Sequence, residues 1–550
     1  MDGGFWHIGF TYDAALVQDV RRFANSTYNP ENKEWCVSVH ITTSAMIQNW
    51  LKTHNFEQKR VYVPSKRFLS YVEVPETVTV QEVLQAADEL GLKRKLRPYQ
   101  ASGVAYMINH GNCINGDCCG LGKSGQSIVT AELIGAFPLL VICPSSVKYN
   151  WQKEWSKWNP DRTVGVVSSK MDDSIWQKDV VVINFDMLMA RNTQQKPTVK
   201  YKELLKRYWG GCIIDEIHFL KSEKAVRTRL TKKITKSIPN IWGLTGTLTQ
   251  NRPAELIQPY QILRKFNETF GDTLEFKYRY CDGKRTLFGF DSSGASNLEE
   301  LHELLKKSGY VRREKREVLA ELPPVVIEKI DVPIDNEKEY CRAENDLLHY
   351  LESIDVACAN SAVNAPHLVM LNTLKQLSIK GKMKFIQAYI SDWMEANVDR
   401  QLVVFGVHRE PLQTLADHFQ APVIQGGISI EEKQHIVDDF AALKHRLLFA
   451  NIQSAGTGTD GLQTHCSDMI FIELPDRSTD IDQTIARLER MGQQNSVTVT
   501  YLLSPQTIDV EMMETLDDKR ILTDVINAGK NSNEVFTDKF FTNRHGRKYS

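Results

Sequence analysis

The stretch NGDCCGLGKSGQS at residues 115–127 has the residue types of a phosphate-binding loop. It contains Gly122, Lys123 and Ser124 in succession, and a helix-forming segment, QSIVTAELIGA, follows directly. A loop that ends where a helix begins points several backbone N–H groups, and the positive end of the helix dipole, at a bound phosphate. These residues therefore predict a nucleotide site.

The loop departs from the strict pattern G-x-x-x-x-G-K-[ST] at its first position, where the chain has Asp117. We expect this position to matter less than Gly120 and Gly122, because the backbone must approach phosphate closely at those two. Cys118 and Cys119 are adjacent, so a disulfide between them would be strained. They are interpreted as small packed residues, and redox regulation is the alternative.

A pair of carboxylates completes the predicted site. GCIIDEIH places Asp215 and Glu216 at the end of an apolar strand, which is where α/β sheets bind ligands. The chemistry of phosphoryl transfer assigns Lys123 to the β- and γ-phosphates and Ser124 with Asp215 to Mg²⁺. Glu216 is expected to orient the attacking water as a base. The predicted cofactors are ATP and Mg²⁺.

The elements that must position these groups follow two series of short apolar runs. PLLVICP, DVVVINF, GGCIIDE and NIWGLTGT form the first series, and QLVVFGVH, HRLLFANIQ, DMIFIELP and VTVTYLL form the second. Apolar runs of this length that alternate with helical stretches are typical of parallel strands. An α/β fold with two parallel-sheet lobes is predicted, with charged helical stretches between them.

Domain limits are predicted from these changes in pattern. They are a small α+β module at 1–58, a connector at 59–95, a first lobe at 96–330 with a helical insertion at about 252–322, a second lobe at 331–525 with a helical segment at about 336–395, and a C-terminal tail at 526–550. In the module, YNPENKEW places turn residues between two apolar runs, which predicts a hairpin.

Composition narrows the class of protein. The chain has 550 residues, 42% hydrophobic and 25% charged, with a formal net charge of −1. This length predicts several domains, and the charge excludes a uniformly basic nucleic-acid binder but not a local basic channel. Ten cysteines show no C-x-x-C repeat, so no metal-cysteine site is expected. No leader or membrane span is recognised, and the expected location is the cytoplasm of a bacterial or phage-infected cell, or the nucleus for a eukaryotic or viral protein.

Several ordered blocks resemble the superfamily-two helicase-like ATPases, and among them the SWI/SNF-type DNA translocases. The resemblance covers residues 96 to about 505 and is carried by LRPYQASGV, DCCGLGKS, VICPSSVKYNWQKEW, DEIH, LTGTLTQN, VRREKREVLAELPP, VVFGVHRE, SAGTGTDGLQ and QTIARLERMGQ. It implies two RecA-like lobes. Departures from the family pattern occur at Cys118, Cys119, Leu248 and the loop 455–461.

The resemblance also implies roles for particular residues. Gln100 is the implied adenine partner, and the nucleotide contacts are Gly120, Leu121, Gly122, Lys123, Ser124 and Gly461. The last block matches the family at Gln483, Arg487, Arg490, Gly492 and Gln493, and the basic stretch matches at Arg312, Arg313 and Lys315. Arg487 and Arg490 are three residues apart, so on a helix both would point the same way, and such a pair can reach across a cleft to the γ-phosphate. A solvated basic face on this helix is the alternative. Lobe closure on ATP would then drive movement on DNA.

Candidate DNA contacts follow from the phosphate contacts that such motors make. They are Ser145, Ser146 and Lys148 in the first lobe and Thr457 and Gly458 in the second, each of which could instead be a cap or turn residue. The module resembles the HARP domain of the annealing-helicase branch at Tyr12, Phe23, Tyr28 and Trp35, and Arg21 and Arg22 are its DNA-binding candidates.

The predicted function is an ATP-dependent translocase on duplex or forked DNA that remodels or reanneals it as a monomeric motor. A strand-separating helicase in recombination or repair is one alternative, although no long hairpin insertion is recognised between residues 400 and 500. An ATP-gated DNA-binding scaffold with weak hydrolysis is the other. The catalytic set Lys123, Asp215, Glu216, Gln483, Arg487 and Arg490 favours the enzyme.

Overall fold

The chain forms two compact units, Met1–Val72 and Glu73–Ser550, and each is described by itself. The computed structural model describes residues 5–9, 13–21, 26–29, 34–38, 77–168, 171–190, 198–286, 289–319, 321–346, 366–455 and 461–529.

The described residues of the first unit form a small antiparallel sheet and one helix. Its elements are β1 (Phe5–Gly9), α1 (Ala14–Arg21), β2 (Ser26–Asn29) and β3 (Glu34–Ser38), with sheet order β1-β3-β2. The predicted hairpin is confirmed, because β2 pairs antiparallel with β3 and Tyr28 lies opposite Trp35. Trp35 is buried, whereas Tyr28 is half exposed. Tyr12, Arg22 and Phe23 lie outside the described residues.

The first lobe of the second unit is built on a seven-stranded sheet of order β14-β4-β11-β10-β5-β7-β6, in which every neighbouring pair is parallel. The strands are β4 (Cys113–Asn115), β5 (Leu139–Cys143), β6 (Val164–Val166), β7 (Val180–Asn184), β10 (Gly211–Asp215), β11 (Asn240–Leu244) and β14 (Tyr310–Val311). The accompanying helices include α3 (Val80–Glu89), α4 (Pro98–His110), α5 (Lys123–Leu133), α6 (Lys148–Trp158), α7 (Glu203–Lys206) and α8 (Val226–Thr235), and β8 (Met189–Ala190) pairs with β9 (Thr198–Val199). The residues of β5 and β7 are all buried, as expected for strands covered on both faces.

A mostly helical segment follows β11. It contains α9 (Ile257–Ile262), α10 (Phe266–Phe270), α11 (Thr273–Tyr280), the hairpin β12 (Lys284–Thr286) and β13 (Gly289–Asp291), and α12 (Leu298–Lys307). The rings of Phe266, Phe270 and Phe276 pack against one another in its core, in tilted and T-shaped arrangements. The segment then returns to the sheet as β14, inside the range 252–322 predicted as an insertion, because Tyr310 and Val311 pair with the edge of β4.

The second lobe is built on a six-stranded parallel sheet of order β15-β20-β19-β16-β18-β17. The strands are β15 (Val325–Asp331), β16 (Leu402–Gly406), β17 (Val423–Ile424), β18 (Leu447–Asn451), β19 (Asp468–Phe471) and β20 (Val497–Leu503). Its helices among the described residues are α14 (Glu337–Asn345), α17 (Pro366–Ala396), α18 (Arg409–Phe419), α19 (Ile430–Ala441), α20 (Ile452–Ala455), α21 (Ser478–Ile485) and α22 (Ile508–Ala528). The short helix α13 (Lys315–Val318) lies between β14 of the first lobe and β15. β15 begins before the predicted boundary at residue 331, since Pro323 and Pro324 prevent a helix there and the chain enters the sheet directly. The prediction of two parallel-sheet lobes is confirmed.

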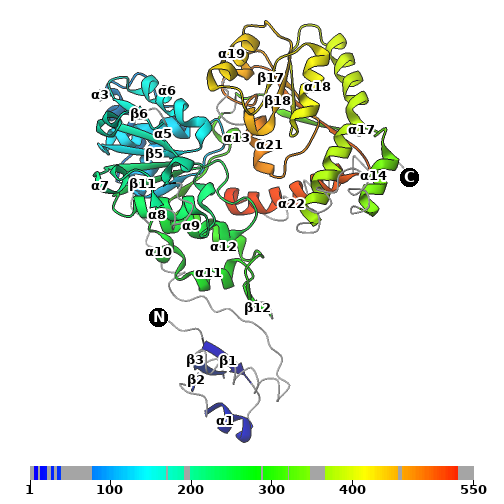
Figure 1. Ribbon diagram of the computed structural model, residues 1–550. Coiled ribbons are helices and arrows are strands. Elements are labelled where there is room, and N and C mark those ends of the chain that lie inside the picture. The colour runs from blue at the N-terminus through cyan, green and yellow to red at the C-terminus, as the bar shows by residue number, and fades with distance from the viewer. Residues whose placement is uncertain are drawn as a thin grey trace. The chain divides into compact units, whose positions relative to one another are not determined.

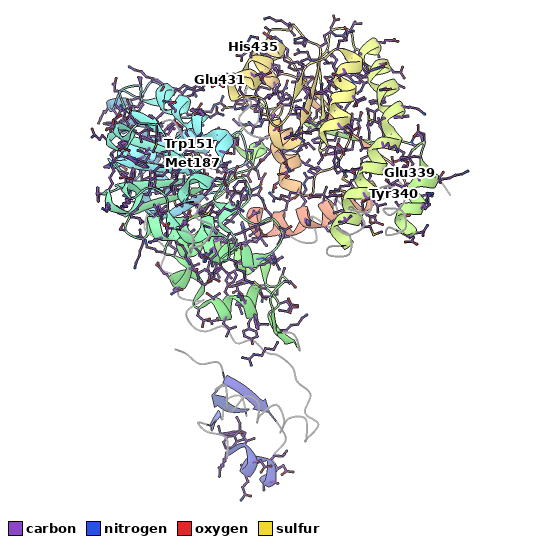
Figure 2. The ribbon with its side chains drawn as sticks, in the orientation of Figure 1. Trp151, Met187, Glu339, Tyr340, Glu431 and His435 are labelled. Atoms are coloured by element: carbon purple, nitrogen blue, oxygen red, sulfur yellow. The ribbon has the colours of Figure 1, made fainter. Side chains whose placement is uncertain are left out.

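Helix α22 connects the two lobes (Figure 1). At its start the N–H of Ile508 donates to the hydroxyl of Tyr340, which lies on α14 (Figure 2). At its end the fully buried Asn527 accepts from the N–H and hydroxyl of Thr249 and donates to the Thr249 carbonyl. His302 of α12 contacts the carbonyl of Ile526 through Nδ1, at 2.9 Å. The helix thus joins the second lobe to the loop after β11.

A charged pair at the carboxyl end of the second sheet predicts a pH dependence of stability. Glu473 accepts from the N–H groups of Val407 and His408 and pairs with the His408 ring. The hydrogen bond to Glu473 raises the pKa of His408, against the opposing effect of burial; of the nearby charges, Lys375 lowers the pKa and Asp476 raises it.

Because the pKa of His408 is raised on folding, its contribution to stability is complete below the unfolded value and is lost as pH rises through the folded value. We expect His408→Gln to lower the free energy of unfolding on the order of 1 kcal/mol at pH 6. The difference between variant and wild type should shrink toward pH 8.5 in thermal melts. A difference that is constant with pH would contradict this assignment.

Candidate active site

The loop at residues 115–123 runs from β4 to the start of α5, as the sequence predicts. Gly120 and Gly122 have φ angles of +92° and +81°. This left-handed region strains residues with a Cβ atom. At Gly122 a Cβ atom would also lie 2.4 Å from Nε2 of Gln100, so the position requires glycine. The loop therefore presents its backbone at the N-terminus of α5, the arrangement that binds phosphate.

Asp117 explains the departure from the strict loop pattern. Its carboxylate is fully buried and is paired with Arg313, with Nε to Oδ1 at 2.9 Å and Nη2 to Oδ2 at 2.5 Å. Gln126 of α5 donates to the same carboxylate at 2.9 Å. The Asp117 side chain therefore lies inside the first lobe, and its contacts with Arg313 and Gln126 hold the loop in place.

Lys123 and Gln100 also make contacts inside the loop. Lys123 donates from Nζ to the carbonyl of Asp117 at 2.7 Å. Gln100 accepts from the N–H of Arg97 at 3.0 Å and donates to the carbonyl of Leu121 at 3.2 Å. The side-chain oxygen and nitrogen of Gln100 are thus both bonded to backbone groups. The contact of Gln100 with adenine stays a prediction. Ser124 lies in the first turn of α5, beside Lys123.

Asp215 and Glu216 stand at the carboxyl end of β10. The indole of Trp151, on α6 in the first lobe, donates to Oδ2 of Asp215 at 2.9 Å (Figure 2), and the N–H of Glu216 donates to Oδ1 at 3.1 Å. Burial, and then the charge of Glu216, raise the pKa of Asp215 to about 6. Both oxygens of Asp215 are therefore held in defined positions.

Glu216 has a different environment from its neighbour. Its backbone is left-handed, with φ of +51°, which turns the side chain out of the strand direction. Oε2 lies 3.1 Å from Nδ1 of His218, and that nitrogen also contacts the hydroxyl of Thr245 at 2.9 Å. Although burial opposes ionisation, the hydrogen bond from His218 and the charges of His218 and Lys123 lower the pKa of Glu216. Glu216 is thus the carboxylate that stays ionised, as a base requires.

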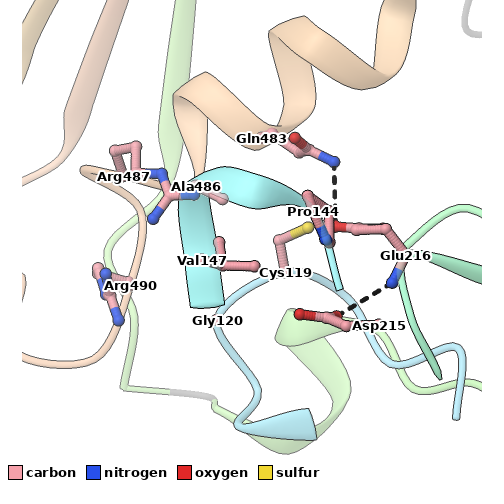
Figure 3. Close-up of a pocket in the computed structure, with 10 residues that line it drawn as sticks. All are labelled: Cys119, Gly120, Pro144, Val147, Asp215, Glu216, Gln483, Ala486, Arg487 and Arg490. Atoms are coloured by element: carbon pink, nitrogen blue, oxygen red, sulfur yellow. Dashed lines mark hydrogen bonds between the residues drawn. The ribbon is translucent and has the colours of Figure 1, made fainter. Parts of the chain in front are cut away.

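The second lobe completes the site from the opposite side (Figure 3). Gln483 on α21 donates to Oε1 of Glu216 at 3.5 Å. Residues of both lobes line one pocket: Cys119, Gly120, Pro144, Val147, Asp215, Glu216, Gln483, Ala486, Arg487 and Arg490. The structure therefore brings together, from distant parts of the chain, six of the predicted site residues. Lys123, Ser124, Gln100 and Gly461 are outside this lining, and Gly461 precedes the short turn Leu462–Thr464.

The prediction that Arg487 and Arg490 share a helix is wrong. Helix α21 ends at Ile485, and the N–H groups of Arg487 and Leu488 bond to carbonyls only three residues back. This tighter turn places Leu488 in the core, where it is fully buried. Both arginines still line the pocket, so the turn places them at the position that was predicted for a helix.

The two cysteines of the loop differ in their surroundings. Cys118 donates from Sγ to Glu314 at 3.1 Å, and burial raises its pKa to about 12. A thiol of this kind is protonated at neutral pH, which supports the packing interpretation for Cys118. Cys119 forms part of the pocket wall.

Only some of the candidate DNA contacts lie within the described residues. Ser145 and Ser146 lie in the short turn Ser145–Val147 after β5, and Lys148 begins α6 and donates to the carbonyl of Val167 at 3.3 Å. In the first unit, the guanidinium of Arg21 lies 5.6 Å from the ring centre of Trp35. Thr457, Gly458 and Arg22 lie outside the described residues.

Comparison with protein families identifies the chain. The model of the SNF2-related domain matches residues 30–378, more than half of the sequence. The chain belongs to the SNF2-related family. The resemblance inferred from the motifs is thereby confirmed.

Individual relatives of this SNF2-related chain include two groups. Human DNA annealing helicase and endonuclease ZRANB3 is 31% identical over 448 residues, which cover 78% of this chain and 40% of that protein. The Caenorhabditis elegans homolog of SWI/SNF-related matrix-associated actin-dependent regulator of chromatin subfamily A-like protein 1 is 26% identical over 546 residues, covering 96% of this chain and 75% of the relative. The chain thus spans about 40% of the length of the ZRANB3 proteins it matches.

Among solved structures, the Sulfolobus solfataricus SWI2/SNF2 ATPase core in complex with dsDNA is 21% identical, with a TM-score of 0.38 over 80% of this chain and 94% of that one.

Within the described part of the SNF2-related chain, no helix is long and apolar enough to cross a membrane.

Sequence reasoning missed two contacts that position the site. Trp151 lies in the motif VICPSSVKYNWQKEW, whose resemblance implies no role for it, and its indole holds Asp215. The family resemblance at Arg313 implies no partner for it, and in the structure it pairs with Asp117. A buried acid in the loop and a basic stretch far along the chain are complementary in charge, and this complementarity was the available signal.

Proposed function

We propose that this chain is an ATP-dependent DNA translocase that acts on duplex or forked DNA and remodels or reanneals it. The observation that carries the proposal is the single pocket lined by Asp215 and Glu216 of the first lobe and by Arg487 and Arg490 of the second. Hydrolysis in a site shared by two lobes couples the chemical step to lobe movement. The names of the relatives, which include annealing helicases, agree with this proposal.

The residues present fit ATP and Mg²⁺. The left-handed glycines and the start of α5 offer N–H donors to phosphate, and Lys123 adds a point charge. Ser124 and Asp215 offer the oxygen ligands that Mg²⁺ prefers. Bound Mg²⁺ would neutralise charge on the β- and γ-phosphates.

The remaining steps are performed by side chains. Glu216 is placed to orient a water molecule and to accept its proton, and Gln483 holds the Glu216 carboxylate from the other lobe. Arg487 and Arg490 stabilise the charge that develops on the transferred phosphoryl group. Gln100, Leu121 and Gly461 are proposed nucleotide contacts.

This proposal assigns a role to each segment of the chain. The module at 1–58 recognises the DNA structure through Arg21 and Arg22, and the connector 59–95 joins it to lobes at 96–330 and 331–525, with a tail at 526–550. Ser145, Ser146, Lys148, Thr457 and Gly458 hold one DNA strand by its phosphates. The motor works as a monomer, in the compartment that holds its DNA, which is the cytoplasm of a bacterial or phage-infected cell or a nucleus.

The test is steady-state ATP hydrolysis by the full chain with no nucleic acid, single-stranded DNA, duplex DNA, forked DNA and single-stranded RNA. We expect duplex or forked DNA to raise the rate at least about tenfold, given the lobe closure that hydrolysis requires. Forked DNA above duplex would support the role of the module.

Other outcomes exclude this proposal. Stimulation by single strands alone would favour a strand-separating helicase. A hydrolysis rate that no nucleic acid changes would leave an ATP-gated scaffold.

Raising the salt concentration should abolish the stimulation of hydrolysis by DNA, because phosphate contacts release counterions.

A further inference from the structure

Three cations in the basic stretch 312–315 contact the phosphate loop, the loop after β11 and the second lobe. Arg312 donates to the carbonyls of Gly116 at 3.2 Å and Gly246 at 2.6 Å. Arg313 pairs with Asp117 beneath the phosphate loop. Lys315 instead contacts the second lobe. The stretch therefore joins the loop of one lobe to the other lobe.

Lys315 makes both of its contacts with one residue. Its Nζ donates to the carboxylate of Glu489 at 2.7 Å and to the main-chain carbonyl of Glu489 at 2.6 Å. The Lys315 side chain is only 10% exposed and that of Glu489 21%. An ammonium group that is largely removed from water must be paired, so these two bonds hold Glu489 in a defined place.

Glu489 is the immediate neighbour of Arg490 in the chain. Helix α21 has already ended at Ile485, so no helix fixes the position of residues 487–490. The phosphate loop lies directly against this segment: a Cβ atom built on Gly120 would be 3.7 Å from Cβ of Arg490 and 3.8 Å from Cε of Lys315. Loop, lysine and arginine thus converge at one point.

We propose that Lys315 is a positioning residue, which holds the arginine turn at residues 487–490 against the phosphate loop. The pairing of Lys315 with Glu489 sets the approach of Arg490, and through it of Arg487, to the reacting phosphate. The kinetic part of this inference rests on the proposed function, whereas the structural part does not.

Replacing Lys315 with methionine keeps most of the length of the side chain but removes its charge and both bonds. We expect kcat with DNA to fall on the order of tenfold to hundredfold, because misplacement of a catalytic group by about 1 Å has an effect of this size. The KM for ATP should change less than about threefold, since the arginines act in the transition state. A loss confined to KM would contradict the assignment.

Conservative variants separate charge from packing. Lys315→Arg should restore most of kcat, because a guanidinium can donate to both the carboxylate and the carbonyl of Glu489. Glu489→Gln keeps the main-chain bond and should give an intermediate kcat. Failure of Lys315→Arg to recover more activity than Lys315→Met would overturn the role of the charge.

A second measurement does not depend on hydrolysis. Amide hydrogen exchange is followed in the full chain without nucleotide, and peptides covering residues 484–493 should exchange faster in Lys315→Met than in wild type. Lys384→Met is the matched control, because that lysine is 84% exposed and pairs with Asp335 on the surface. It should leave both exchange and hydrolysis unchanged.

The two readouts distinguish the two proposals. Unchanged exchange at residues 484–493 in Lys315→Met would overturn the positioning role, whatever the enzyme activity. Faster exchange in the variant, together with a wild-type chain that does not hydrolyse ATP, would leave the positioning role intact and refute the proposed function. Faster exchange with the expected loss of kcat supports both.

Discussion

Replacing Glu216 with glutamine is expected to lower DNA-stimulated ATP hydrolysis about 10³-fold, within the range that general base catalysis supplies. Glutamine has the shape of glutamate but cannot accept a proton from water. The carboxylate it replaces is the one whose pKa is lowered by His218, so it is the base available at neutral pH. The measurement is steady-state hydrolysis with saturating duplex or forked DNA.

Binding should survive this substitution. Glu216 is not among the predicted phosphate or Mg²⁺ contacts, so the affinity for a fluorescent ATP analogue is expected to change less than about threefold. Glu223→Gln is the matched control, because Glu223 is exposed a few residues further along the chain and should leave the rate unchanged. Parallel losses of binding and hydrolysis in Glu216→Gln would refute the role of Glu216 as a base.

The second large effect is on stability. Arg313→Met leaves the carboxylate of Asp117 fully buried and without its cationic partner. Removing one member of a buried ion pair destabilises by about 3–5 kcal/mol, because an uncompensated charge remains. In the variant, Gln126 still donates one hydrogen bond to the Asp117 carboxylate. We expect thermal melting of the first lobe at a markedly lower temperature, and weaker nucleotide binding because the phosphate loop rests on this pair.

A double-mutant cycle tests the cause. Asp117→Asn combined with Arg313→Met removes both charges and should recover a large part of the loss, which identifies the buried charge as its source. Arg97→Met is the control, since the Arg97 and Glu321 side chains are 45% and 62% exposed and such pairs contribute less than about 1 kcal/mol. Additive effects of the Asp117 and Arg313 substitutions would rule out the coupling described here.

The phosphate loop shows how far local sequence determines a site. Gly120, Gly122 and Lys123 could be recognised because glycines with left-handed backbone and a helix start are needed wherever a chain wraps phosphate. The apolar runs around β5, β7 and β10 predicted parallel strands because a strand covered on both faces must be apolar throughout. These requirements act between residues that are close in the chain, so they can be recognised in the sequence.

Contacts between distant segments depended on the tertiary structure. The pairing of Asp117 with Arg313, of Trp151 with Asp215 and of Lys315 with Glu489 joins residues that only the packing of sheets and helices brings together. Helix α21 likewise ends at Ile485, and the tighter turn that follows places Leu488 in the core, which the spacing of the arginines did not predict. The sequence by itself determined the two lobes and predicted the chemistry of the site. The tertiary structure decided which charges meet, because pairing requires a distance of a few ångströms that spacing along the chain does not specify.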